Sequence, residues 1–330
     1  MTRTLHLIDA GGLIHRAWYA VQRPQRADVV AEALRTFGAM LDRIRRVHDV
    51  RLGAIAFDAP GATWRHAQFP AYKLGRAAKR EPRLAAAQMV FGEVARAHGW
   101  QCYGCQGYEA DDVVATLAGY VVALQGRVQI YAQDKDLLAL VSPQVQIVDE
   151  VRGSTYADDQ GVQARLAEGV TAARVGDFLA LMGDTSDGVP GVPGCGEVTA
   201  AQLVRAHPDL PAIIAADPKI RGKHPFRDPE AVARLELARR LVQLDHAVPL
   251  TMHELGRMTP AVPPTLEQLA LRVQGLPWGD QPPLWTLPGK AHLLEDWLER
   301  TAIIAESYPT LVLAERAAYD QLLLKHGGTR

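Results

Sequence analysis

The feature that most constrains the fold is the alternation of short apolar runs with longer helical patterns through the first half of the chain. The candidate strands cover residues 5–9, 53–58, 128–132 and 145–149. Between them, residues 110–124 repeat apolar side chains every three or four positions, which predicts a helix with one buried face. That face is expected at Val114, Leu117, Val121 and Leu124. Strands that alternate with helices predict an α/β fold with a mostly parallel sheet flanked by helices.

The pattern changes at about residue 170, where helices replace the strand–helix alternation. Residues 173–183 and 197–207 are predicted helices joined by a glycine-rich loop. A proline-rich stretch then precedes a last helical pattern. We therefore predict an α/β domain over 1–168, an all-helical subdomain over 169–256, and a proline-rich linker with a C-terminal helical extension over 257–330.

Composition excludes several classes of protein. The 36 basic and 37 acidic residues leave a net charge of −1, so no partner is held by a global excess of charge. Three cysteines in 330 residues cannot cross-link the chain and fit a reducing compartment. Neither a signal peptide nor a membrane span is predicted, because no stretch reaches roughly 18 apolar residues. We expect a cytoplasmic protein without a membrane partner.

Acidic residues gather where the predicted strands end and one helix begins. They are Asp9, Asp58, Glu109, Asp111, Asp112, Asp134 and Asp136. Each alone is more often a turn former or a helix cap than a ligand. Carboxyl ends of parallel strands share one edge of a sheet, so these acids would repel one another unless cations neutralised them. Oxygen ligands favour Mg²⁺ or Mn²⁺, and two ions about 4 Å apart would cleave a phosphodiester, which indicates a nucleic-acid substrate.

Five segments, in the same order along the chain, resemble the motifs of a known family. They cover residues 7–20, 57–76, 107–118, 134–143 and 179–204, and they include GYEADD and LMGDTSDGVPGVPGCG. These segments resemble the motifs of the 5′ nuclease family, which includes the N-terminal domain of bacterial DNA polymerase I and stand-alone flap endonucleases of phages and bacteria. The resemblance implies a PIN-like (Rossmann-like) sheet, a helical arch over about 70–95, and a helix-three-turn-helix subdomain.

The resemblance also assigns the acids to two metal ions. Asp9, Asp58, Glu109, Asp111 and Asp134 match acids around one metal, and Asp112 belongs to the same cluster. Asp136, Asp184 and Asp187 match the acids of the second metal, with Asp134 between the two. Without the resemblance, Asp184 and Asp187 are interpreted as caps of their loop.

Basic residues concentrate between residues 61 and 83, where the only acid is Glu81. Taken alone, this run is as consistent with a solvated helix face as with phosphate binding. By resemblance, Lys73 and Arg76 contact the scissile phosphate, Tyr72 stacks on a terminal base, and Arg16 lies close to the metals. The alternatives are burial for Tyr72 and a structural ion pair for Arg16. Further DNA contacts are expected from Arg65, Lys79, Arg80 and Arg83.

The glycine-rich loop resembles the part of the family that grips duplex DNA and binds K⁺. Gly191, Gly194 and Gly196 precede a helix whose free amides would hold a phosphate. An ordinary helix connection is the alternative. The family often has a lysine where this chain has Val198, and Thr-Gly where it has Ala132 and Gln133.

These patterns predict a structure-specific 5′ nuclease that hydrolyses DNA at 5′ ends and 5′ flaps by two-metal-ion catalysis, in replication or repair. Mg²⁺ is the expected cofactor, with Mn²⁺ as a substitute. Branched, gapped or 5′-ended DNA, a replication polymerase and a monomeric state are expected in a bacterial or phage setting. A non-catalytic DNA-junction binding protein and a PIN-type ribonuclease are the alternatives.

Overall fold

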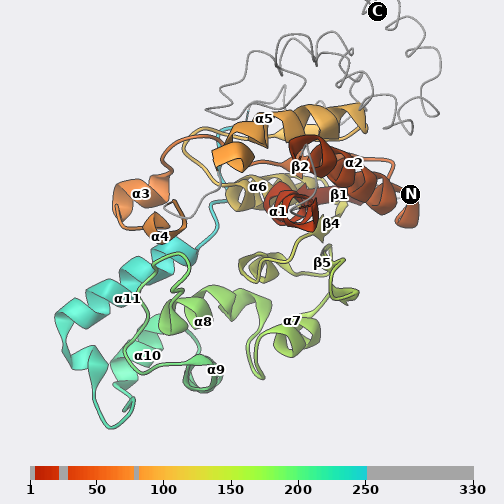
Figure 1. Ribbon diagram of the computed structural model, residues 1–330. Coiled ribbons are helices and arrows are strands. Elements are labelled where there is room, and N and C mark those ends of the chain that lie inside the picture. Colours follow the sequence, from red (N-terminus) through yellow and green to blue (C-terminus); the bar gives the residue numbers. More distant parts are fainter. Residues whose placement is uncertain (1–3, 22–28, 78–81, 251–330) are drawn as a thin grey trace, which may run out of the picture. The chain divides into compact units, whose positions relative to one another are not determined.

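The computed structural model (Figure 1) describes residues 4–21, 29–77 and 82–250. These residues form two compact units. The first holds the described residues of Met1–Asp9, Ala56–Lys79 and Tyr103–Leu255, and the second those of Ala10–Ile55 and Arg80–Cys102. The predicted linker and extension at 257–330 lie outside the described residues.

Six strands form one sheet in the order β3-β2-β1-β4-β5-β6. Their bounds are β1 Thr4–Asp9, β2 Gly53–Ala56, β3 Gln101–Tyr103, β4 Arg127–Tyr131, β5 Val145–Asp149 and β6 Ser154–Tyr156. Strand β4 runs parallel to β1 and β5, whereas β6 runs antiparallel to β5. The predicted α/β class and the four predicted strands are confirmed. β3 and β6 escaped prediction because each is three residues long, too short to show an apolar pattern.

The parallel strands β1, β4 and β5 are largely buried because apolar side chains predominate in them. Leu7 of β1 lies beside Ile130 of β4, which lies beside Ile147 of β5. All three side chains are buried. A strand that is apolar on both faces requires cover on both faces, as in α/β proteins. The carboxyl ends of β1, β4 and β5 therefore share one edge of the sheet.

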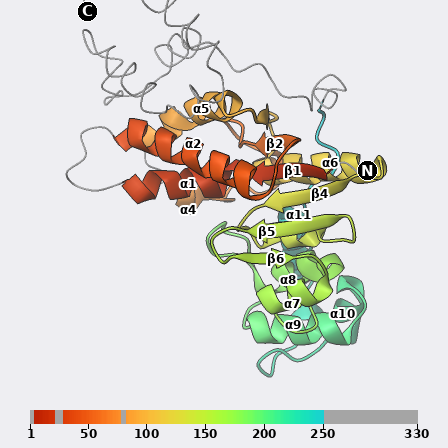
Figure 2. The same ribbon diagram turned by 90° about the vertical axis from the view of Figure 1, so that its right-hand side faces the viewer.

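Helices make up most of the rest of the first unit. They are α3 Trp64–Gln68, α4 Leu74–Ala77, α6 Ala110–Ala123, α7 Asp159–Arg165, α8 Val175–Met182, α9 Glu197–Ala206, α10 Leu210–Ala216 and α11 Pro229–Val242. Short 3₁₀ turns lie at η1 Asp136–Leu140, η2 Ala172–Arg174 and η3 Pro225–Arg227. Figure 2 shows β4, β5 and β6 in succession, with α7 to α10 beyond them. The predicted helices at 173–183 and 197–207 are confirmed as η2 with α8, and as α9.

Helix α6 carries the predicted buried face over most of its length. Val114, Leu117 and Val121 are buried, as expected. The prediction for Leu124 is wrong: the helix ends at Ala123, and the Leu124 side chain is 66% exposed. The buried face of α6 thus extends to Val121, and Leu124 after the helix faces solvent.

The second unit is helical in its described part, apart from residues of β2 and β3. Its helices are α1 Ala10–Val21, α2 Val29–Val47 and α5 Pro82–Ala97. Helix α2 packs against α1 and α5, and Phe37 meets Phe91 edge to face at 5.0 Å between ring centres. Among the described residues, every helix is too short or too polar to cross a membrane.

Candidate active site

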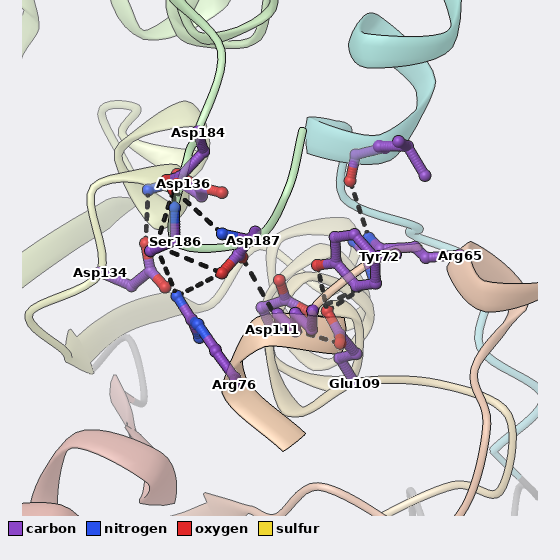
Figure 3. A network of polar contacts seen from close by, with 12 residues as sticks. Arg65, Tyr72, Arg76, Glu109, Asp111, Asp134, Asp136, Asp184, Ser186 and Asp187 are labelled. Atoms are coloured by element: carbon purple, nitrogen blue, oxygen red, sulfur yellow. Dashed lines mark hydrogen bonds and ion pairs between the residues drawn. The ribbon is translucent and has the colours of Figure 1, made fainter. Parts of the chain in front are cut away.

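Two groups of carboxylates lie in the first unit (Figure 3). The α6 carboxylates, at the start of α6, are Glu109, Asp111 and Asp112. The loop carboxylates are Asp134, Asp136, Asp184 and Asp187. Asp134 and Asp136 follow β4, whereas Asp184 and Asp187 follow α8.

The α6 carboxylates are held at the N-terminus of their helix by capping. Glu109 is the N-cap residue, and Asp112 accepts a hydrogen bond from the Glu109 amide at 3.3 Å. Asp58 accepts one from the Ala110 amide at 2.9 Å. These acids satisfy amides that have no partner within the helix and complement its dipole. Capping therefore fixes the positions of acids that were predicted as metal ligands.

Asp112 is enclosed by fixed donors. Its side chain is fully buried, and both oxygens bind the Arg65 guanidinium at 2.7 and 2.9 Å. The indole of Trp64 and the Asp245 amide donate at 3.1 and 2.8 Å. A carboxylate with this many donors has no lone pair directed at an ion. The structure thus contradicts the prediction of Asp112 as a metal ligand and shows a structural acid.

Arg65 was predicted to contact DNA, and this prediction is wrong. Its side chain is 1% exposed and binds the carbonyls of Leu241 and Gln243 in addition to Asp112. Burial by itself lowers the pKa of the guanidinium, but Asp111, Asp112 and Glu109 outweigh it and raise the pKa overall. Arg65 is a permanent buried cation beneath the α6 carboxylates.

Tyr72 is also buried rather than available to a nucleic-acid base. Its side chain is 4% exposed, and its hydroxyl donates to Glu109 Oε2 at 3.0 Å. Burial raises the pKa of the phenol, so it remains a donor at neutral pH. The prediction of base stacking is wrong, because no face of the ring reaches solvent.

Lys73 connects the two groups of carboxylates. Its Nζ donates to Glu109 Oε1 at 2.8 Å and lies 3.8 Å from Asp187 Oδ2. Burial lowers its pKa, but Glu109, Tyr72 and Asp187 outweigh this effect and raise the pKa overall. The backbone of Lys73 has φ of 53°, which is rare outside glycine and marks a strained position. Its amide is held by the Asp187 carbonyl at 2.8 Å.

A tight loop after α8 presents Asp184 and Asp187. Gly183 has φ of 75°, and a Cβ at Gly183 or Gly191 would collide with the main chain of the other side of the loop. Asp184 accepts from the amide and hydroxyl of Ser186 at 2.8 and 2.6 Å. Packing of the loop therefore explains why glycine occupies position 191. Its predicted contact with DNA stays a prediction.

Basic side chains neutralise the loop carboxylates. Lys135 Nζ lies 3.0 Å from Asp184 Oδ2. Arg76 forms an ion pair with Asp187 and donates to the Ser186 hydroxyl at 3.0 Å, although its side chain is 54% exposed. Long, partly exposed cations can exchange one anionic partner for another at low cost.

The pKa shifts follow burial and crowding. Burial, together with neighbouring acids, raises the pKa of Asp111, Asp136 and Asp187 despite nearby Arg65, Lys135 and Lys73. Asp184 is the opposite case: burial raises its pKa, but Ser186 and Lys135 outweigh this and lower it to about 2. Burial is the largest cause of the raised pKa values, and repulsion between neighbouring acids adds to it.

A divalent cation fits this set of donors. Asp136 Oδ1 is buried without a hydrogen-bond partner, and an unpaired buried carboxylate oxygen is a candidate ion ligand. No three acidic, histidine or cysteine side chains of the described residues are already arranged around a common metal position. The carboxylate oxygens that could bind an ion are thus in place, and in this structure they pair with Lys73, Arg76 and Lys135.

The contacts given above do not include the remaining predicted residues, some of which lie outside the described residues. Asp9 ends β1 and is half-buried, and Arg16 lies half-buried on α1 in the second unit. Lys79 and Arg80 lie outside the described residues, as does the side chain of Arg83. The roles of all five stay predictions.

The glycine-rich loop ends at the start of α9. Gly196 is the N-cap of α9 and makes no side-chain cap, and Gly194 has φ of 83°. Val198, at the position where the family often has lysine, is 71% exposed. The predicted DNA contacts of Gly194 and Gly196 stay predictions.

Sequence reasoning missed three partners of the acids. Lys135 lies between Asp134 and Asp136 in the motif, and Ser186 lies between Asp184 and Asp187, so adjacency was the available signal. Trp64 had no predicted role, yet it binds Asp112. Its partner is 48 residues away, so only the folded chain reveals the contact.

Comparison with known proteins identifies the family. A model described as the N-terminal resolvase-like domain of 5′-3′ exonuclease matches residues 4–167, and one described as its C-terminal SAM fold matches residues 170–261. The chain belongs to the 5′-3′ exonuclease family. Members of this family are 5′-3′ exonucleases, which are hydrolases.

Two relatives illustrate the match. DNA polymerase I of Bacillus caldotenax is 31% identical over 261 residues, which cover 78% of this chain and 30% of that protein. A 5′-3′ exonuclease of Aquifex aeolicus is 29% identical over 243 residues, which cover 73% of this chain and 82% of that protein. The chain thus spans about 30% of the length of the polymerase relative.

Solved structures show the same fold. The bacteriophage T5 D15 protein co-crystallised with metal ions has a TM-score of 0.57 at 17% identity, with 92% of this chain and 100% of that chain covered. The T5 D15 flap endonuclease in a complex with DNA and metal ions has a TM-score of 0.54 at 16% identity, with the same coverage.

Proposed function

We propose that the chain is a structure-specific 5′ nuclease that hydrolyses DNA phosphodiesters at 5′ ends and 5′ flaps by two-metal-ion catalysis, in replication or repair. One observation carries the proposal: the turn after β4, the start of α6 and the loop after α8 bring their acids together around Lys73 and Arg76 (Figure 3). An inert protein would gain nothing from acids whose pKa values are raised by burial and by neighbouring acids.

Seven acids are proposed to hold two Mg²⁺ ions, with Mn²⁺ as a substitute. They are Asp9, Asp58, Glu109, Asp111, Asp134, Asp136 and Asp184, and Asp187 is proposed as an eighth. The unpaired Oδ1 of Asp136 supports this choice. Bound ions would supply an activated water and stabilise the leaving oxygen. Asp112 is excluded from the ligand set because its oxygens are fully engaged.

Lys73 and Arg76 are proposed to receive the scissile phosphate. Each now pairs with Asp187, and an arriving phosphate offers the same negative charge to the same side chains. The hydrogen bond from the Lys73 amide to the Asp187 carbonyl keeps the Lys73 ammonium near the carboxylates. The exposed Arg76 side chain can turn toward the DNA. Arg16 is proposed to assist them.

The start of α9 is proposed to grip the duplex. Gly196 leaves the first amides of α9 without a side-chain cap, and a Cβ there would meet open space, so a phosphate can approach. K⁺ is proposed to bind through carbonyls of the same loop. We further propose that the chain acts as a cytoplasmic monomer beside a replication polymerase, since the family's domain also occurs within DNA polymerase I.

The alternatives are less well supported. A non-catalytic junction binder has no use for a cluster of acids that includes an unpaired buried oxygen at Asp136. A PIN-type ribonuclease has no need of the SAM-fold region that this chain carries at residues 170–261.

The test uses three 5′-labelled substrates with Mg²⁺: a DNA flap, a nicked duplex and an RNA–DNA hybrid. The proposal predicts release of the flap and short 5′ products, and no cleavage in EDTA or by Asp136→Asn. Cleavage in EDTA contradicts metal catalysis, binding without cleavage supports the junction binder, and preference for the RNA strand supports the ribonuclease.

A further inference from the structure

Arg65 joins two parts of the first unit that are far apart in the sequence. On one side it binds both oxygens of Asp112, and on the other its Nε and Nη2 donate to the carbonyls of Leu241 and Gln243 at 2.8 and 3.1 Å. Arg65 and Asp112 lie in the region that matches the resolvase-like domain, whereas Leu241 and Gln243 lie in the region that matches the SAM fold. The guanidinium therefore bridges the two.

Further hydrogen bonds extend this bridge along α6. The Asp245 amide donates to Asp112 at 2.8 Å. One helical turn later, the Thr116 hydroxyl donates to the Asp245 carbonyl at 3.4 Å and accepts from the Val248 amide at 3.1 Å. The chain after α11 thus runs along the first turns of α6, and we call this set of contacts the α11–α6 junction.

The charge of Arg65 also reaches the other α6 carboxylates. Its Nη1 lies 3.2 Å from Glu109 Oε2 and 3.7 Å from Asp111 Oδ1. The planar guanidinium presents its donors in a fixed fork, so the direction of Nη1 is set once the main-chain carbonyls hold Nε and Nη2. The end of α11 therefore determines where the cation lies beneath Glu109 and Asp111.

We propose that Arg65 is a positioning residue: by anchoring on the end of α11, it fixes the orientation in which Glu109 and Asp111 face the active site. The inference rests on the proposed nuclease function and adds to it a coupling between the SAM-fold region and the carboxylates. Arg65 touches neither substrate nor ion in this account.

The main test compares Arg65→Lys with Arg174→Lys. Lysine keeps the charge at position 65 but cannot hold two carbonyls and a carboxylate together. Arg174 is a matched control, because it binds Asp177 at 2.9 Å and the carbonyls of Val204 and His207 at 3.1 and 2.6 Å, all within the helical region. Both variants lose the same kind of bridge.

Three quantities are measured for each variant: flap affinity in EDTA, Mn²⁺ affinity by calorimetry without DNA, and single-turnover rate on a saturating flap. We expect Arg65→Lys to bind the flap within about twofold of wild type, to bind Mn²⁺ at least about tenfold more weakly, and to cut at least about tenfold more slowly. Arg174→Lys should keep its Mn²⁺ affinity and its rate within about twofold. Equal losses in both variants, or an unchanged Mn²⁺ affinity in Arg65→Lys, would overturn the inference.

Thr116→Val provides a second test should Arg65→Lys fail to fold. It removes two hydrogen bonds of the junction without altering any carboxylate or cation. Weaker Mn²⁺ binding, by about twofold or more, with unchanged flap affinity supports the coupling, whereas wild-type Mn²⁺ affinity contradicts it. A wild-type chain that binds Mn²⁺ but cuts no flap would refute the proposed function alone.

Discussion

The α6 carboxylate Asp112 and the loop carboxylate Asp136 both lie among other acids, yet their oxygens are paired in opposite ways. Asp112 has donors on both oxygens, from Arg65, Trp64 and Asp245. Asp136 Oδ1 has no partner. The difference indicates that acids of the family motifs do not all have the same role, and we expect the one with an unpaired oxygen to bind a metal ion.

The cations of the two groups differ in the same way. Arg65 is buried and bound to main-chain carbonyls, so it cannot leave. Lys135 and Arg76 approach the loop carboxylates from partly exposed positions and form ion pairs of the kind that contribute little to stability. Asp112 therefore has permanent partners, and the loop carboxylates have replaceable ones.

The largest effect is expected from Asp112→Asn, which breaks the buried pair and leaves the Arg65 charge poorly compensated. The free energy of unfolding should fall by about 3–5 kcal/mol. Urea unfolding followed by circular dichroism measures it. If the variant is as stable as wild type, Asp112 is not the structural acid of this comparison.

Asp136→Asn should have the opposite signature. We expect the single-turnover rate on a 5′ flap to fall about a thousandfold, since a charge facing the reacting groups is lost. Stability should be unchanged or higher, because repulsion with Asp134, Asp111 and Asp184 is relieved. A large loss of stability in the same urea assay would place Asp136 with Asp112 among the structural acids.

Lys73→Ala tests whether this cation acts in the cleavage step or in general DNA binding. We expect a fall of roughly a hundredfold in the single-turnover rate, the effect of losing a charged transition-state contact. Flap affinity should change far less, and the slope of its salt dependence should fall by about one. Poor binding with a normal rate at saturation would make Lys73 a general DNA contact.

The smallest effect concerns pH in the absence of metal. The folded chain holds protons on Asp111 and Asp136 more tightly than the unfolded chain does, because burial raises both pKa values. Above the raised pKa values, ionisation of these two acids lowers the free energy of unfolding. This loss is relieved as pH falls toward about 4, where carboxylates of the unfolded chain also become protonated. Asp184, with a pKa of about 2, stays ionised between neutral pH and about pH 4 and keeps its contribution to stability over this range.

In EDTA, the thermal midpoint should therefore rise slightly as pH is lowered from neutral toward about 4. Asp136→Asn should show a smaller rise than wild type. A wild-type midpoint that falls steadily over the same range would show that these acids are not destabilised by ionisation.

Local patterns in the sequence were sufficient for the framework of the molecule. Leu7 and Ile130 belong to apolar runs long enough to predict strands, and Gly183 and Gly196 mark helix ends that the structure confirms. β3 and β6 were missed because three residues show no periodicity. These successes and failures all depend on neighbours in the chain.

Burial was the property that local patterns could not supply. Arg65 and Tyr72 lie in a basic run, and basic runs usually face solvent. Their partners are distant: Asp112 and Glu109 are 47 and 37 residues away, and Leu241 is 176 residues away. Only the docking of the end of α11 on Arg65, and of the chain after it along α6, turns a predicted DNA contact into a buried support.

The most direct test of this account is a calorimetric titration of Mn²⁺ into the DNA-free wild type and Asp136→Asn at neutral pH. The account predicts saturable binding to wild type and a loss of at least about tenfold in affinity in Asp136→Asn. Equal affinity in the two proteins would contradict the central claim that the unpaired loop carboxylate is a metal ligand.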